Sequence, residues 1–181
     1  MKSGKLIHKF KATDGREVIL RTPRWEDLDD LLEFINSLVD ERAEIFWRTH
    51  ATREQEAQWL VKHLIEMEED KIFCLVSEVD GKVIANSKIR KHSGYSSHTC
   101  NLGIAIKNGY RDIGIGTQMM NTLIAQAKKW GLKWIELYVF GTNKRAIHVY
   151  RKVGFNEAGR KPNFIFKDGK YIDHLNMIME L

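Results

Sequence analysis

The chain has 181 residues, of which 43% are hydrophobic and 29% charged, so it is long enough and apolar enough to bury a globular core. Residues 1–15 carry lysines but no apolar run, and no stretch reaches the length that crosses a membrane. The two cysteines, Cys74 and Cys100, make neither a disulfide framework nor a Cys-x-x-Cys pair. We therefore expect a cytoplasmic protein with reduced thiols and no membrane partner.

The formal net charge of +5 favours an anionic ligand. The lysines are interleaved with acidic residues along the chain rather than gathered into one block, so a small phosphorylated cofactor is enough to explain the charge. Two short basic groups, at 88–91 and 128–129, keep RNA open as an alternative partner. We expect an enzyme with a phosphorylated cofactor, and a nucleotide- or RNA-binding module is the alternative.

The first half of the chain predicts one strand followed by two helices. Alternating apolar residues at 17–21 indicate the strand, and an apolar stripe that follows two acidic residues indicates a helix over about 26–39. The capping pattern Thr52-x-x-Gln55 predicts the start of a second helix. We find no repeat, low-complexity stretch or linker, which predicts a single domain over residues 1–181.

The second half predicts a strand meander and then alternating helices and strands. Strands are expected at 72–79, 82–90 and about 98–106, with the hairpin turn Asp80-Gly81 between the first two. A helix over about 115–130, a strand over 134–140, a helix over 143–154 and strands near 155 and over 171–181 follow. This order predicts an α/β (α+β) fold with a mixed, mostly antiparallel sheet of about seven strands and helices on both faces.

A glycine-rich segment, residues 107–117, joins the third strand of the meander to the next helix. Glycines such as Gly114 and Gly116 let the backbone approach a ligand, and the free N–H groups of a helix N-terminus attract an anion. Arg111 adds a permanent positive charge. The segment therefore predicts a pyrophosphate site, and the alternative is a turn that only packs the helix against the strand.

Two other phosphate-binding loops do not fit this segment. A Walker loop ends in Gly-Lys-Ser/Thr, whereas Gly116 is followed by Thr117 and Gln118. A dinucleotide-binding fingerprint has a third glycine where this chain has Met119. Glu136 lies twenty residues after Gly116, as an acidic ribose ligand would, but it falls inside a predicted strand. These differences argue against a nucleotide triphosphatase and against a nicotinamide-dependent oxidoreductase.

The sequence also lacks the motifs that are typical of metal sites and of serine hydrolases. His92, His98 and Cys100 show no paired ligand spacing such as His-x-x-x-His. No serine lies in a Gly-x-Ser-x-Gly elbow. We expect no metal.

The pattern Arg-x-x-Gly-x-Gly at 111–116, behind the strand that ends Ile104-Ala105-Ile106, resembles the acetyl-CoA motif of the GNAT superfamily of N-acetyltransferases. Farther along, Asn143, Tyr150 and Gly154-Phe155 resemble the second signature of that family. The tail resembles the branch that holds ribosomal-protein N-terminal, spermidine and amino-acid acetyltransferases. The resemblance is strong from about residue 100 onward and loose before it.

This resemblance implies a GNAT fold with a sheet splayed at the cofactor site, and direct transfer of an acetyl group from acetyl-CoA to a primary amine. It implies Tyr150 as the acid that protonates the leaving thiolate. The alternatives are that Tyr150 packs in a helical stripe and that Asn143 only caps its helix. The implied cofactor-binding residues are Ile104, Ala105, Ile106, Arg111, Asp112, Ile113, Gly114, Ile115, Gly116, Thr117 and Asn143.

The base and the acceptor are left open by the resemblance. An alkylammonium must lose a proton before it attacks, so a carboxylate, a histidine or a water chain should stand near it. Glu44 and His98 are the candidates, and their alternatives are an exposed helix acid and a loop histidine. Free diffusion of the proton to water is a third option. The acceptor is a protein N-terminus, an amino acid or a polyamine, and the positive net charge disfavours the polyamine. A homodimer also stays open.

Overall fold

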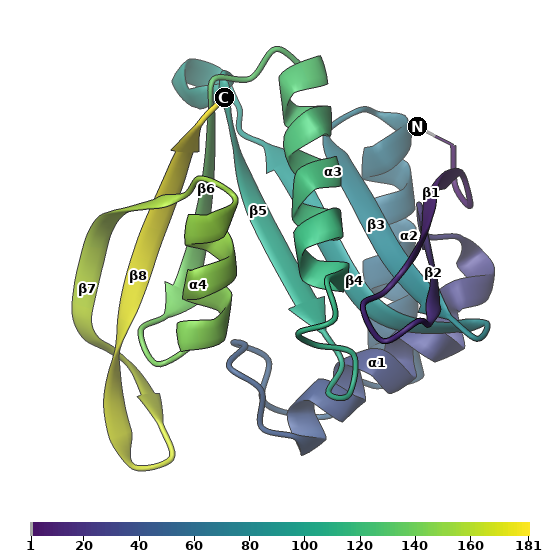
Figure 1. Cartoon of the computed structure of the whole chain (residues 1–181), viewed down its shortest axis with the longest axis horizontal. Helices are drawn as coiled ribbons and strands as arrows, with labels where there is room; N and C mark the ends of the chain where they lie inside the picture. The colour runs from purple at the N-terminus through teal and green to yellow at the C-terminus, as the bar shows by residue number, and fades with distance from the viewer. Residues whose placement is uncertain (1) are drawn as a thin grey trace. The chain divides into compact units, whose positions relative to one another are not determined.

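The computed structural model describes residues 2–181 (Figure 1). These residues form eight strands, four α-helices and two short 3-10 helices. They divide into two compact units. The first unit runs up to Arg90 and includes residues 104–119, and the second comprises residues 91–103 and 120–181. The strand β5 and the helix α3 each have residues in both units.

The first unit contains four antiparallel strands in the order β1-β2-β3-β4 (Figure 1). One of these strands, β1, does not stand out in the sequence, because its two partly buried residues, Ile7 and Phe10, are three positions apart and give no alternating pattern. It raises the number of strands from the expected seven or so to eight. The bounds are β1 Leu6–Lys11, β2 Glu17–Arg21, β3 Ile72–Val79 and β4 Lys82–Lys91.

Two α-helices belong to this unit, α1 (Leu28–Asp40) and α2 (Arg53–Glu68). The helix expected from residue 26 begins instead with a 3-10 turn, Trp25–Asp27, before α1 starts. The predicted capping box of α2 is present, since Gln55 N donates to Thr52 Oγ1 at 3.2 Å and Thr52 N donates to Gln55 Oε1 at 2.9 Å. The helices and strands share an apolar core of Leu28, Leu31, Leu60, Val76 and Val83.

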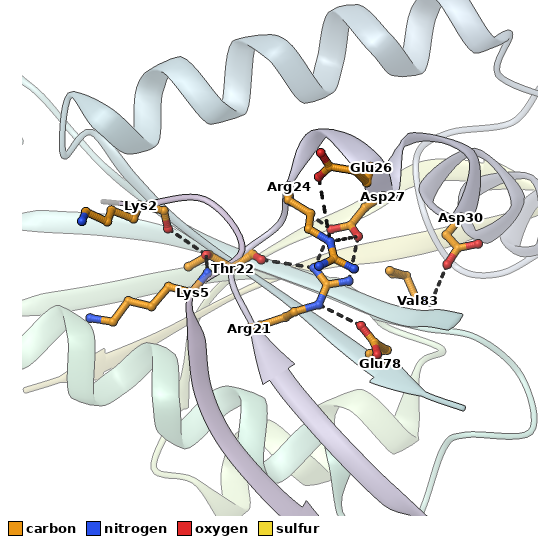
Figure 2. Close-up of polar contacts among 10 residues, drawn as sticks. All are labelled: Lys2, Lys5, Arg21, Thr22, Arg24, Glu26, Asp27, Asp30, Glu78 and Val83. Carbon is orange, nitrogen blue, oxygen red and sulfur yellow. Dashed lines mark hydrogen bonds and ion pairs between the residues drawn. The ribbon is translucent and has the colours of Figure 1, made fainter. Parts of the chain in front are cut away.

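A buried ionic network ties β2 to β3 and to the start of α1 (Figure 2). The Arg21 guanidinium donates to both carboxylate oxygens of Asp27, at 2.6 and 2.7 Å, and its Nε donates to Glu78 at 2.8 Å. Asp27 also accepts from the backbone N–H of Arg24 at 2.9 Å. Because the side chains of Arg21 and Asp27 are only 7% and 4% exposed, each charge depends on its partner for stability.

The second unit contains four strands in the order β5-β6-β8-β7, in which β5 and β6 are parallel and the other neighbours antiparallel. Its buried residues include Leu123, Ile135, Leu137, Phe155 and Met177. Figure 1 shows α4 on the viewer's side of β6 and β8. The bounds are β5 Thr99–Ile106, α3 Ile115–Lys129, β6 Trp134–Phe140, α4 Lys144–Lys152, β7 Asn156–Lys167 and β8 Lys170–Glu180.

The parallel pairing of β5 with β6 is short. It runs from Thr99 opposite Trp134 to Asn101 opposite Glu136. Both strands continue beyond this point, β6 to Phe140 and β5 to Ile106. The parallel register thus covers three residue pairs. Within residues 2–181, no helix combines the length and the apolar character needed to cross a membrane.

Candidate functional site

The glycine-rich segment lies in the first unit, between the end of β5 and the start of α3. Lys107 N donates to the carbonyl oxygen of Ile84 at 2.9 Å, which fixes the first residue of the segment to β4. Thr13 N donates to the carbonyl oxygen of Ile113 at 3.1 Å, which fixes its far end to the turn between β1 and β2. The segment is therefore held at both ends by backbone hydrogen bonds.

The backbone of this segment has the conformation that its glycines permit. Gly109 and Gly114 have φ angles of 83° and 89°, in the left-handed region that favours glycine. At Gly116 a Cβ atom would lie 3.2 Å from Cδ1 of Ile106, so a larger residue would require the Ile106 side chain to shift by a few tenths of an ångström. The first helical hydrogen bond of α3 runs from Gln118 N to Gly114 O. The N–H groups of residues 115–117 precede it, and they form the kind of helix terminus that binds an anion.

Arg111 is the cation of the segment. Its Nε donates to the carbonyl oxygen of Ile106 at 2.7 Å, and its Nη2 forms an ion pair with the carboxylate of Glu41. The side chain remains 29% exposed, so the guanidinium keeps a surface for a further partner. Lys107, by contrast, forms an exposed ion pair with Glu33 at 2.8 Å. Arg111 is therefore both placed and partly neutralised by the protein itself.

Arg16 is a residue of this site that sequence reasoning missed. Its Nη2 donates to the carbonyl oxygen of Gly109 at 2.8 Å, and its guanidinium lies 4.5 Å from the centre of the Tyr110 ring. It also pairs with Asp14 at 2.6 Å. Arg16 and Gly109 are 93 residues apart in the chain, so no local pattern could have linked them.

Asn143 and Tyr150 lie in the second unit, on α4. The side-chain oxygen of Asn143 accepts from Ala146 N at 3.1 Å, so Asn143 does cap its helix. Tyr150 is 8% exposed, and its ring is tilted against Phe155 with centres 6.2 Å apart. Burial raises the pKa of Tyr150 to about 12, so the phenol keeps its proton near neutral pH.

The two residues considered as bases lie in irregular segments. Glu44 follows the end of α1 and is half-buried, so it is not the exposed helix acid of the alternative interpretation. His98 is an exposed turn residue directly before β5, and its carbonyl oxygen accepts from Lys133 N at 2.8 Å. Neither belongs to a cluster suited to a metal, and no such cluster is found in the part of the chain that the structure describes.

Comparison with known families places residues 32–155 on the model of the acetyltransferase (GNAT) family. The match covers the glycine-rich segment as well as Asn143 and Tyr150. It leaves out β1 and β2 at one end and all of β7 and β8 at the other. The match therefore covers more than half of the chain, including its most distinctive sequence patterns.

Individual relatives of the chain also have names that describe N-acetyltransferases. The chain is 33% identical over 146 residues to an uncharacterized N-acetyltransferase of Methanocaldococcus jannaschii. The aligned region covers 76% of this chain and 60% of the relative. It is 31% identical over 101 residues to an L-amino acid N-acetyltransferase of Escherichia coli, and this aligned region covers 55% of this chain and 62% of the relative. The chain thus spans about three fifths of the length of these two curated relatives.

A solved structure extends the comparison to the fold. The crystal structure of a ribosomal-protein-alanine N-acetyltransferase from Brucella melitensis superimposes with a TM-score of 0.78 at 25% identity. The superposition covers 90% of this chain and 99% of that one. The expected α/β fold is therefore confirmed.

Proposed function

Because the chain belongs to the acetyltransferase (GNAT) family, we propose that it transfers an acetyl group from acetyl-CoA to a primary amine. The observation that carries the proposal is the segment 111–117, which contains Arg111, left-handed Gly114 and the N–H groups at the start of α3. Anionic phosphates are the ligands that such a segment favours. We further propose that residues 1–181 act as one domain and that the protein works in the cytoplasm.

The residues of this segment fit the pyrophosphate of acetyl-CoA. Asp112, like Gly114, has a positive φ angle, 63°, so successive N–H groups can turn toward one side of the loop. Residues 111–117 would hold the pyrophosphate, and the backbone of residues 104–106 would pair with the pantetheine arm. The early end of the β5–β6 register, at Asn101 and Glu136, supports this second contact because it leaves backbone groups of both strands to find other partners.

The chemical step needs a proton donor for the sulfur. As the amine attacks the thioester carbonyl, the C–S bond breaks, the amine loses a proton and the thiolate gains one. We propose that the hydroxyl of Tyr150 supplies this second proton and that Asn143 holds the cofactor arm. The raised pKa of Tyr150 keeps the hydroxyl protonated. Because the oxygen of Asn143 is used by Ala146 N, its Nδ2 group is the part left to donate.

For the acceptor, we propose the α-amine of a free amino acid or of a protein N-terminus. The names of the Escherichia coli and Brucella melitensis relatives mention an L-amino acid and an alanine of a ribosomal protein, and the net charge of +5 disfavours a polycation such as spermidine. The acidic group at the end of α2 does little to reverse this, since Glu66 is paired with Arg90 and Glu69 with Lys71.

The basic group at 88–91, which kept RNA open as a partner, faces protein groups. Lys88 Nζ lies 2.7 Å from Nε2 of His63, and Arg90 makes two hydrogen bonds to Glu66, at 2.6 and 2.8 Å. Lys91 Nζ lies 4.3 Å from the centre of the Trp130 ring. These contacts do not favour the nucleic-acid alternative.

The proposal is tested by release of CoA from acetyl-CoA in the presence of single amines. The panel contains the peptide Ala-Ala-Ala, L-methionine and spermidine, and mass spectrometry identifies the acetylated product. We expect turnover with the peptide or the amino acid to exceed turnover with spermidine. A preference for spermidine would refute the acceptor class, and no CoA release with any amine would refute the activity.

A further inference from the structure

A polar cluster in the second unit surrounds Glu136, the last residue of β6 that pairs with β5. One carboxylate oxygen, Oε2, accepts from the hydroxyl of Tyr138 at 3.2 Å and from Nδ2 of Asn176 at 3.3 Å. The other, Oε1, lies 3.6 Å from Nε2 of His92. Two donors therefore hold Oε2, and Oε1 is left directed toward the imidazole.

The hydrogen bonds of His92 determine which of its nitrogens carries the proton. The hydroxyl of Thr99 donates its only hydrogen to the carbonyl oxygen of Ser96, at 2.9 Å. Nδ1 of His92, 2.9 Å from the same hydroxyl oxygen, must then be the donor in that contact. A neutral His92 consequently presents the lone pair of Nε2 to Oε1 of Glu136. Both Nε2 of His92 and Oε1 of Glu136 can then accept a proton.

Glu136 and Tyr138 point to the opposite face of β6 from its apolar residues. Ile135 and Leu137 are buried at 0% and 1% exposure, and successive side chains of a strand alternate between faces. Figure 1 shows α4, which carries Tyr150, against one face of β6 and β8. Glu136 is 28% exposed and His92 32%, so a substrate and water can both reach this cluster.

We propose that Glu136 is the general base of the reaction, and that His92 passes the proton on to solvent. This inference rests on the proposed function. The ammonium nitrogen of the acceptor gives a proton to Oε1 of Glu136, and the lone pair that this frees forms the bond to the acetyl carbon. The C–S bond breaks, the sulfur takes its proton from Tyr150, and the second proton that the nitrogen loses as the amide forms returns to the oxygen of Tyr150. The proton on Glu136 then moves to Nε2 of His92, and from its exposed edge to water.

The neighbouring titratable groups stay neutral during this cycle. Burial, followed by the charge of Glu136, raises the pKa of the Cys100 thiol to about 12. The same two causes, in the same order, raise the pKa of Tyr138, which keeps it a donor to Oε2. Cys100 and Tyr138 therefore keep their protons and take no part in the transfer.

The test compares Glu136→Gln with the unaltered protein, using whichever of Ala-Ala-Ala or L-methionine releases CoA faster. We expect kcat/KM at pH 7 to fall by about 10²-fold or more, with the Kd of acetyl-CoA and the melting temperature little changed. We also expect the loss to shrink between pH 7 and pH 9, because an α-amine with a pKa near ~8 then loses its proton without help. His92→Gln leaves Glu136 in place, and we expect its kcat/KM to fall by about tenfold.

Glu157→Gln is the matched control, since Glu157 lies in the same unit and pairs with Arg160 on the surface. We expect it to keep its kcat/KM within twofold. If Glu136→Gln stays within threefold of the unaltered protein, or loses the same factor at every pH, Glu136 is not the base. An unaltered protein that releases no CoA with any amine overturns the proposed function itself, which separates the two failures.

Discussion

Arg111 and Glu41 form an ion pair between the glycine-rich segment and the residue that follows α1. The same arginine donates through Nε to the carbonyl oxygen of Ile106, at 2.7 Å. The ion pair partly neutralises the guanidinium, and the hydrogen bond to Ile106 fixes its orientation. A phosphate that binds Arg111 must therefore share the guanidinium with Glu41 or displace the Glu41 carboxylate from it.

This relationship predicts opposite effects for the two partners. Arg111→Ala should weaken the binding of acetyl-CoA by about 10- to 100-fold, as expected for the loss of a hydrogen bond to a charged group worth ~1.5–3 kcal/mol. Glu41→Gln should tighten binding by a few-fold, because it removes the competing carboxylate. Isothermal titration calorimetry measures both, and equal affinities for the unaltered protein and Arg111→Ala would show that Arg111 does not contact the cofactor.

Tyr150→Phe separates a catalytic phenol from a packing ring. The substitution keeps the ring against Phe155 and removes only the hydroxyl, so we expect the melting temperature and the Kd of acetyl-CoA to change little. Loss of general-acid help should lower kcat by about 10²-fold. A kcat within about threefold of the unaltered protein would leave Tyr150 as a core residue.

Glu56, on the buried face of α2, predicts a pH dependence of stability. Burial raises its pKa from an ordinary value of 4.5 to about 7, so the folded protein holds a proton that the unfolded chain loses between these pH values. The unfolded state then binds fewer protons, and the free energy of unfolding falls as pH rises from 4.5 to 7. After allowance for partial solvation, the loss is roughly 1–2 kcal/mol.

Urea denaturation at pH 5 and pH 8 checks this prediction. Relative to the unaltered protein, Glu56→Gln should gain stability at pH 8 and little at pH 5. Glu54→Gln, on the exposed side of the same helix, is the control and should show no such difference. A pH dependence unchanged by Glu56→Gln would rule out this carboxyl as its source.

The buried network of Figure 2 predicts a large cost for the loss of Arg21. Arg21→Met leaves the carboxylate of Asp27, 4% exposed, without its main partner, and should lower the free energy of unfolding by about 3–5 kcal/mol. Arg53→Met removes an exposed pair with Asp29 and should cost less than ~1 kcal/mol. Similar costs in chemical denaturation for both variants would contradict the importance of the network.

Local patterns account for the parts of the fold that sequence could predict. The capping box at Thr52 and Gln55, the hairpin at Asp80-Gly81 and the helix after Gly114 depend on residues close together in the chain, and all three are present. The apolar run of β3 is also a strong signal, because seven of its eight residues are buried, and β4 alternates between buried and partly buried residues beyond Ala85. Such signals survive in a single sequence because their physical causes are local.

Features that depend on distant residues were not predictable. The strand β1 lacks a buried stripe, and the contact of Arg16 with Gly109 joins residues 93 positions apart. Glu136 was considered only as a ribose ligand, because nothing in the sequence places it beside His92, Tyr138 and Asn176. The pairing of β6 with β8 and the loop before β5 bring these side chains together. The roles proposed for Tyr150, Asn143 and residues 104–117 remain predictions.

Calorimetric titration of acetyl-CoA tests the central claim most directly, because every proposed role depends on this cofactor. We expect saturable binding by the unaltered protein. Gly114→Leu, which puts a bulky side chain at a φ angle of 89°, should bind much more weakly, whereas Lys107→Ala should bind nearly as well as the unaltered protein. The absence of any response to acetyl-CoA or CoA, together with a response to NAD or RNA, would contradict the account.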